Sequence, residues 1–160
     1  MLRLLLCTLL LASSLAAQQA PYAKPGGAKA TATGPQPPSC QWLTQGSAER
    51  YLGGDVFLKL SSPDVEKRFC HFVQPQSRQS LDILVSKKPL TTCPAGSMLL
   101  RGVGNQAAMC KARSAKGDMV SGRVRDSFFT ITYHSPANKT TADQENGLEQ
   151  IAEQVAGNLF

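Results

Sequence analysis

Cysteines are the residues of this chain with the clearest chemical potential. There are five, at positions 7, 40, 70, 93 and 110, and the first lies in an N-terminal segment that we expect to be removed. The even set Cys40, Cys70, Cys93 and Cys110 then remains, which in an exported protein predicts two disulfide bonds. Four cysteines allow three pairings, and spacing alone does not choose among them. Because no Cys-x-x-Cys motif occurs, the pattern does not indicate a thiol redox site.

Histidines are the next candidates for chemistry, and there are two, His71 and His134. Neither is accompanied by a Gly-x-Ser-x-Gly nucleophile turn or by the paired spacing of a helical metal site. The sequence therefore predicts no catalytic residue, no cofactor, no cofactor-binding residue and no metal ligand. It favours a protein that is not an enzyme.

A group of cations stands out in the second half of the chain: Lys111, Arg113, Lys116, Arg123 and Arg125. In a strand, alternate residues share a face, and these cations alternate with Cys110 and Ala112 or with apolar Val124. We therefore predict that four or five cations share one face of a sheet. Such a face would attract an anionic envelope component or an acidic protein partner. The alternative is a solvated face that suppresses edge pairing.

The N-terminus predicts export. Arg3 precedes the apolar run 4–15, and Ser14-Leu15-Ala16 forms a cleavage site before Ala17, as in a secretory signal peptide spanning 1–16. We expect a secreted or periplasmic protein. No other segment approaches the ~20 apolar residues that cross a bilayer, so no transmembrane segment is expected in the mature chain. Export also makes nucleic acid an unexpected partner.

The rest of the chain divides into a linker and one domain. Residues 17–39 are rich in Pro, Gly and Ala without apolar periodicity, which predicts a flexible linker. Residues 40–160 have the size of a single domain, in which two disulfides would add useful stability.

Periodicity predicts the elements of that domain. A short helix is expected over 43–52, with Thr44 as its cap and Gly53-Gly54 as its stop, and a long helix over 141–159. Alternating apolar residues predict six strands, around 56–60, 69–73, 81–85, 108–112, 120–124 and 129–133. A turn at Asp126-Ser127 would pair residue 124 with 129, whereas segment 86–104 is expected to be loop or mixed structure. The fold class is therefore α+β: an antiparallel sheet of about six strands, with both helices packed on one face.

Several short motifs carry a resemblance to a known family. They are Cys40-x-Trp-Leu-Thr44, Ala48-Glu-Arg-Tyr-Leu-Gly53, Cys70-His-Phe72 and Gly102-Val-Gly-Asn-Gln-Ala107. Over residues 40–159 the chain resembles a family of bacterial secreted proteins and envelope lipoproteins of unknown function, represented by actinobacterial LpqN-like lipoproteins. The resemblance implies a sheet-and-helix fold and a Cys40–Cys70 disulfide, which leaves Cys93 with Cys110. This chain lacks the acylation cysteine of the lipoprotein members.

Three classes of function remain open. The first is an exported non-enzymatic interaction domain of the envelope or extracellular space, which would use the polar sheet face or the loop 86–104. The second is a small secreted hydrolase that uses His71 or His134. The third is an inhibitor-like scaffold whose loop docks into another protein. The sequence favours the first.

Overall fold

The computed structural model describes residues 39–113, 117–136 and 141–160. The predicted signal peptide at 1–16, the predicted linker 17–39 except for its last residue, and Lys116 lie outside the described residues. No helix in the described part is long and apolar enough to cross a membrane.

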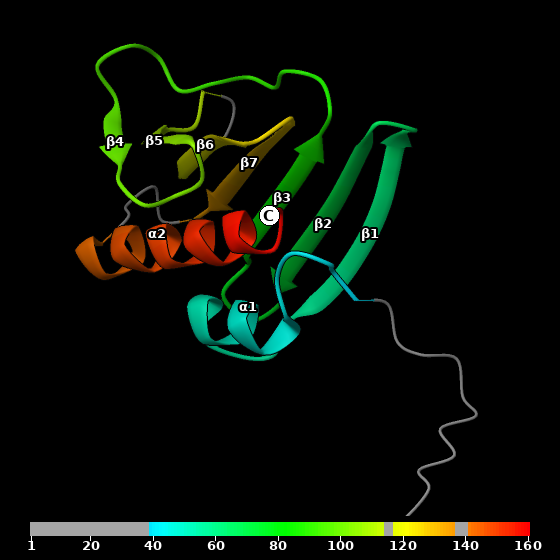
Figure 1. The fold of residues 1–160 in the computed structure, drawn as a ribbon. Helices are drawn as coiled ribbons and strands as arrows, with labels where there is room; N and C mark the ends of the chain where they lie inside the picture. The colour runs from blue at the N-terminus through cyan, green and yellow to red at the C-terminus, as the bar shows by residue number, and fades with distance from the viewer. Residues whose placement is uncertain (1–38, 114–116, 137–140) are drawn as a thin grey trace, which may run out of the picture. The chain divides into compact units, whose positions relative to one another are not determined.

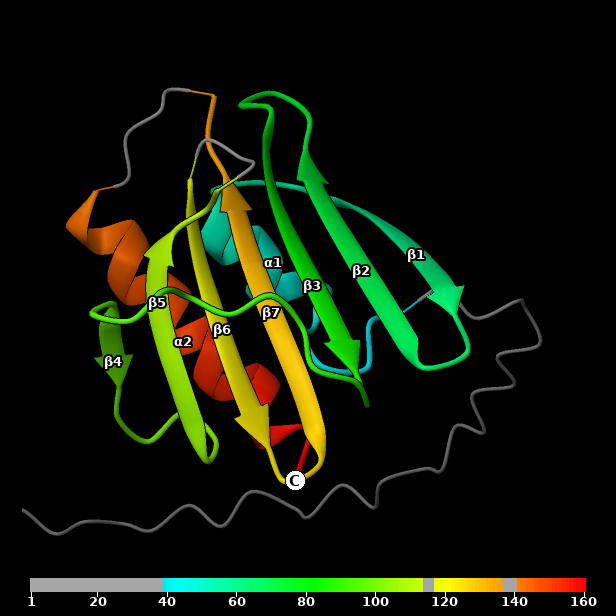
Figure 2. The same ribbon diagram turned by 90° about the horizontal axis from the view of Figure 1, so that it is seen from above.

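The domain is one antiparallel sheet with two helices on one of its faces (Figures 1 and 2). The strands are β1 (Phe57–Asp64), β2 (Lys67–Gln74), β3 (Gln79–Ser86), β4 (Met98–Leu100), β5 (Gln106–Lys111), β6 (Asp118–Val124) and β7 (Ser127–His134). Their order in the sheet is β1-β2-β3-β7-β6-β5-β4. The α+β prediction is confirmed. The strand that it did not foresee is β4, a short edge strand inside the segment expected to be loop or mixed structure.

The first helix, α1 (Gln45–Leu52), begins and ends where the sequence predicted. Thr44 is extended and its side-chain oxygen accepts a hydrogen bond from the Ser47 amide, which satisfies one free donor of the first turn. Gly53 ends the helix with φ = +77°, a left-handed conformation that glycine adopts without strain. The helix packs on β2 and β3.

The second helix, α2 (Ala142–Gly157), is anchored by a reciprocal cap and by an apolar stripe. Thr141 accepts from the Gln144 amide, and the Gln144 side chain accepts from the Thr141 amide. The buried residues follow the predicted i, i+3, i+4 spacing: Leu148, Ile151, Ala152, Val155 and Ala156. The stripe packs toward β6, so both helices cover the same face of the sheet.

The hairpin of β6 and β7 has a different register from the predicted one. Val124 pairs with Ser127, so the two-residue turn is Arg125-Asp126, not Asp126-Ser127. Because the register moved by two residues, the apolar faces still coincide and Gly122 now lies opposite Phe129. A Cβ at Gly122 would lie 2.4 Å from the Phe129 ring, so the close approach of this aromatic requires glycine.

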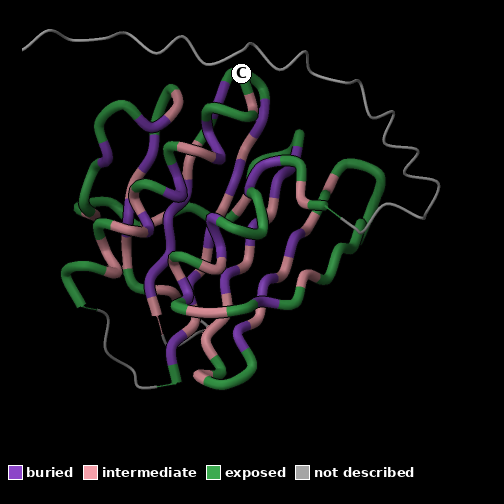
Figure 3. The backbone as a smooth tube through the Cα atoms, turned by 90° about the horizontal axis from the view of Figure 1, so that it is seen from below, coloured by how far each residue is buried: buried purple, intermediate pink, exposed green. Residues whose placement is uncertain are grey.

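The core lies between the sheet and the helices. Along the central strands buried positions alternate with partly exposed ones, a pattern visible in Figure 3. The buried apolar residues of β7 are Phe129, Ile131 and Tyr133, each with no exposed surface. The other face carries no helix within the described residues; we call it the helix-free face.

The disulfides are the pairs that the resemblance implied. Cys40–Cys70 joins the segment before α1 to β2, and Cys93–Cys110 joins the β3–β4 connection to β5. That connection, residues 87–97, crosses the helix-free face in front of β7 and β6, and we call it the strap (Figure 2). The Cys93 amide donates to Ser121 Oγ at 2.9 Å, which holds the strap against β6.

Candidate anion-binding site

The predicted cations do not share one face of the sheet. Lys111 lies opposite Asp118, and its ammonium pairs with Asp118 at 2.5 Å and with Glu145 of α2 at 3.6 Å, on the helix-covered side. Arg123 lies five positions after Asp118 on β6 and therefore on the other, helix-free face. Arg113 follows the far end of β5, and Lys116 is outside the described residues. The prediction of a shared basic face is wrong, because strand alternation separates Lys111 from Arg123.

Arg125 is not on a strand at all. It occupies the first position of the β6–β7 turn with φ = +52°, and its amide donates to Asn105 Oδ1. The predicted turn at Asp126-Ser127 lay one position too late, which left Arg125 outside the turn.

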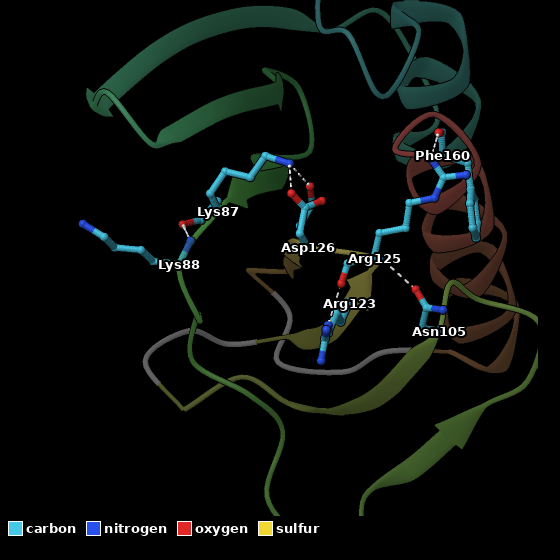
Figure 4. Close-up of polar contacts among 9 residues, drawn as sticks. Lys87, Lys88, Asn105, Arg123, Arg125, Asp126 and Phe160 are labelled. Atoms are coloured by element: carbon cyan, nitrogen blue, oxygen red, sulfur yellow. Dashed lines mark hydrogen bonds and ion pairs between the residues drawn. The ribbon is translucent and has the colours of Figure 1, made fainter.

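The structure instead gathers cations at one end of the sheet. β3 ends at Ser86, which pairs with Phe128 of β7, so Lys87 and Lys88 lie beside the β6–β7 turn. Arg123 and Arg125 lie at the same end of the sheet, and we call these four residues the basic rim; Figure 4 shows their side chains pointing in different directions.

The two lysines of the basic rim are held by acidic neighbours. Lys87 Nζ lies 3.0 Å from Asp126 Oδ2 and 2.9 Å from Ser127 Oγ, and Lys88 Nζ pairs with Glu66 at 2.5 Å. The hydrogen bond from Lys87 lowers the pKa of the Asp126 carboxyl, and the one to Glu66 raises the pKa of Lys88. These ion pairs are exposed, and they orient the lysines more than they stabilise the fold.

The two arginines are held by main-chain oxygens and aromatic rings. Arg123 Nε donates to the Arg125 carbonyl at 2.6 Å, and its guanidinium lies 5.7 Å from the centre of the Phe128 ring. Arg125 donates to a main-chain oxygen of Phe160, the last residue of the printed sequence, at 2.8 Å and lies 5.4 Å from the centre of the Phe160 ring. Neither guanidinium forms an ion pair with an Asp or Glu carboxylate in the described part of the chain. Both therefore offer a positive charge from a restrained position.

A second polar cluster lies on the helix-free face. Asp82 on β3 lies between His71 on β2 and His134 on β7. Each oxygen of its carboxylate forms a hydrogen bond with one imidazole. Oδ1 contacts His71 Nδ1, and Oδ2 lies 2.9 Å from His134 Nε2. Burial acts to raise the pKa of the Asp82 carboxyl, but the hydrogen bonds from His134 and His71 outweigh it and place the pKa below its usual value. Phe69 stacks on His71 with ring centres 6.1 Å apart.

Sequence reasoning missed this cluster because it treated the two histidines as isolated. The alternation of apolar and polar residues in β2 and β3 contained a signal for it, because His71 lies directly opposite Asp82 once these strands pair. His134 reaches the same carboxylate diagonally, from its position opposite Ser80. Over the described ranges no group of three or more His, Cys, Asp and Glu side chains is arranged to hold a metal ion.

No family model, curated protein or solved structure matches the chain.

Proposed function

We propose that this protein is an exported, non-enzymatic binding domain of the bacterial envelope or extracellular space, and that its partner is an anionic envelope component or an acidic protein. The observation that carries the proposal is the pair Arg123 and Arg125, whose guanidiniums have no Asp or Glu partner among the described residues and which lie at the same end of the sheet as Lys87 and Lys88.

The side chains of Arg123 and Arg125 are already restrained, which favours a role in binding over simple solvation of their charges. A flexible surface cation loses rotamer freedom when it captures a ligand, whereas Arg123 and Arg125 already lie against rings and carbonyls. A guanidinium can present two parallel N–H groups to a carboxylate or phosphate, which a lysine does not do.

The compartment is part of the proposal. Export rests on the predicted signal peptide, residues 1–16, and two disulfides are compatible with an oxidising compartment outside the cytoplasm. Relationship to the LpqN-like family likewise stays a proposal based on the motifs.

The experiment is an affinity pull-down from native envelope and secreted fractions with the oxidised mature chain. We expect Arg123→Glu/Arg125→Glu to lose a captured partner at low salt, and added salt to release that partner from the wild type. The matched control is Arg78→Glu/Arg113→Glu, which changes the net charge equally at the opposite end of the sheet. Arg78 has φ = +57°, close to the +52° of Arg125, so the two doubles impose similar backbone demands. Equal capture by both doubles, with unchanged melting temperatures, would refute the proposal.

One observation favours a second function, ester hydrolysis. The Asp82 carboxylate holds His71 through Nδ1, which leaves Nε2 as the free nitrogen, the orientation used by histidine bases in hydrolases. With p-nitrophenyl acetate as substrate, this function requires that His71→Gln and Asp82→Asn each lower the rate by at least about tenfold. A rate that His71→Gln leaves unchanged would eliminate it.

A further inference from the structure

The outer edge of β1 is unpaired in the part of the chain that the structure describes. β1 is the terminal strand of the sheet and pairs only with β2, so the backbone of its other side has no strand partner among the described residues. Apolar side chains are exposed on both faces of this edge, Phe57 at 72% on the helix-free side and Leu60 at 42% on the helix side. An added strand would cover both.

A pocket opens beside this edge on the helix side. It encloses about 310 Å³ between β1, β2 and the segment before α1. Trp42 and Leu60 give it apolar walls, and Arg68 places a cation in it. Within the described residues Arg68 forms no ion pair with a carboxylate.

The helix-free side of the same edge is also cationic. Lys59 is exposed there, opposite His71, and it too has no ion pair in the described part of the domain. Like charges on neighbouring strands are destabilising, so Lys59 disfavours pairing with the β1 strand of a second copy. Acidic side chains on an incoming strand would satisfy both Lys59 and Arg68.

We propose that the β1 edge binds an extended, acidic segment of a partner protein by strand addition. Main-chain hydrogen bonds to residues 57–61 supply affinity. An apolar side chain of the segment enters the pocket beside Leu60 and Trp42, and carboxylates of the segment face Lys59 and Arg68. The register is limited to the first part of β1, because the pairing is irregular between Ser61 and Asp64. This inference does not depend on the basic rim.

The probe is an acetylated, amidated octapeptide in which Val or Leu alternates with Glu, and the control peptide carries Lys in place of each Glu. Trp42 is the only tryptophan of the chain, so its emission reports directly on the pocket. Amide hydrogen exchange of residues 57–61 reports on the edge. We expect the Glu peptide to slow that exchange, to shift the emission, and to bind about tenfold more tightly than the Lys peptide.

Charge reversal makes the test specific. Lys59→Glu/Arg68→Glu should invert the preference and select the Lys peptide, whereas Arg78→Glu/Arg113→Glu should leave it unchanged. Arg123→Glu/Arg125→Glu should also leave it unchanged, which separates this site from the proposed function of the basic rim. The proposal fails if both peptides bind equally or if charge reversal does not invert the preference. It also fails if the outward amides of residues 57–61, those that do not donate to β2, are already protected in the free full-length mature chain.

Discussion

Asp82 is the residue that organises the polar part of the helix-free face. Its carboxylate bonds two imidazoles from the two flanking strands, and its own pKa is lowered in the folded state by these bonds. The contribution to stability is therefore present above the unfolded pKa of about 4 and is lost as the pH falls through the lower folded pKa.

The sign of this linkage gives a first prediction. Asp82→Asn should lower the free energy of unfolding by about 1 to 2 kcal/mol near pH 6, because the amide cannot accept from both imidazoles as strongly. Below about pH 4 the difference from wild type should shrink. Urea unfolding of the two proteins between pH 3 and pH 6 measures it, and a difference that grows toward low pH would contradict the assignment.

Gly122 gives a second prediction at the residue scale, because its contact with Phe129 leaves no room for a side chain. Gly122→Ala should cost about 1 to 3 kcal/mol, since the added methyl would overlap the buried Phe129 ring. Phe129→Leu in the same chain frees space, so the double variant should be more stable than the sum of the two single effects predicts. If the two single effects on the free energy of unfolding simply add in the double variant, the contact between residue 122 and Phe129 is not the cause of the destabilisation.

At the scale of elements, the strap is held on the sheet by Cys93–Cys110 and by the bond from the Cys93 amide to Ser121. The disulfide closes a short loop, with a sequence separation of 17. Cys93→Ser/Cys110→Ser should lower stability by about 3 kcal/mol or less and should raise the exchange rate of the amide at position 93. Cys40→Ser/Cys70→Ser is the control: it should leave that amide protected, because this pair anchors a different segment. Equal exchange at position 93 in the two doubles would refute a local role for the strap disulfide.

Elements also show what the sequence could and could not predict. The caps at Thr44, Gly53 and Thr141 were readable because they depend on a few adjacent residues. The β6–β7 register was not, because Arg125 takes a left-handed turn conformation for which Asn and Gly are the usual signals. The Asp82 cluster and the basic rim each join residues far apart in the chain, so both required the pairing of β3 with β7.

At the scale of the whole molecule, the chain is basic, with 17 basic and 11 acidic residues and a formal net charge of +6. A positive net charge by itself attracts anionic partners. The contribution of the basic rim therefore has to be separated from that of the net charge by experiment.

This balance gives a prediction for the molecule as a whole. Glu149→Lys on α2 raises the net charge by two units and relieves the i, i+4 repulsion with Glu145 and Glu153, so it should raise stability by up to about 1 kcal/mol. Capture of an anionic partner in the pull-down should change by less than about twofold. A gain as large as the loss caused by reversing Arg123 and Arg125 would mean that overall charge, not the basic rim, governs binding.

The strand order has a consequence for how the domain can be assembled. β7, the last strand to be made, lies between β3 and β6, and the strap passes over its helix-free side. In a chain that emerges N-terminus first, one side of β3 therefore stays unpaired until β7, which ends at residue 134, has also emerged. If Cys93 and Cys110 are oxidised before then, the final hairpin must insert beneath a strap that is already tethered. The time between emergence of Cys110 and emergence of His134 is therefore the period in which this sheet is most open to mispairing.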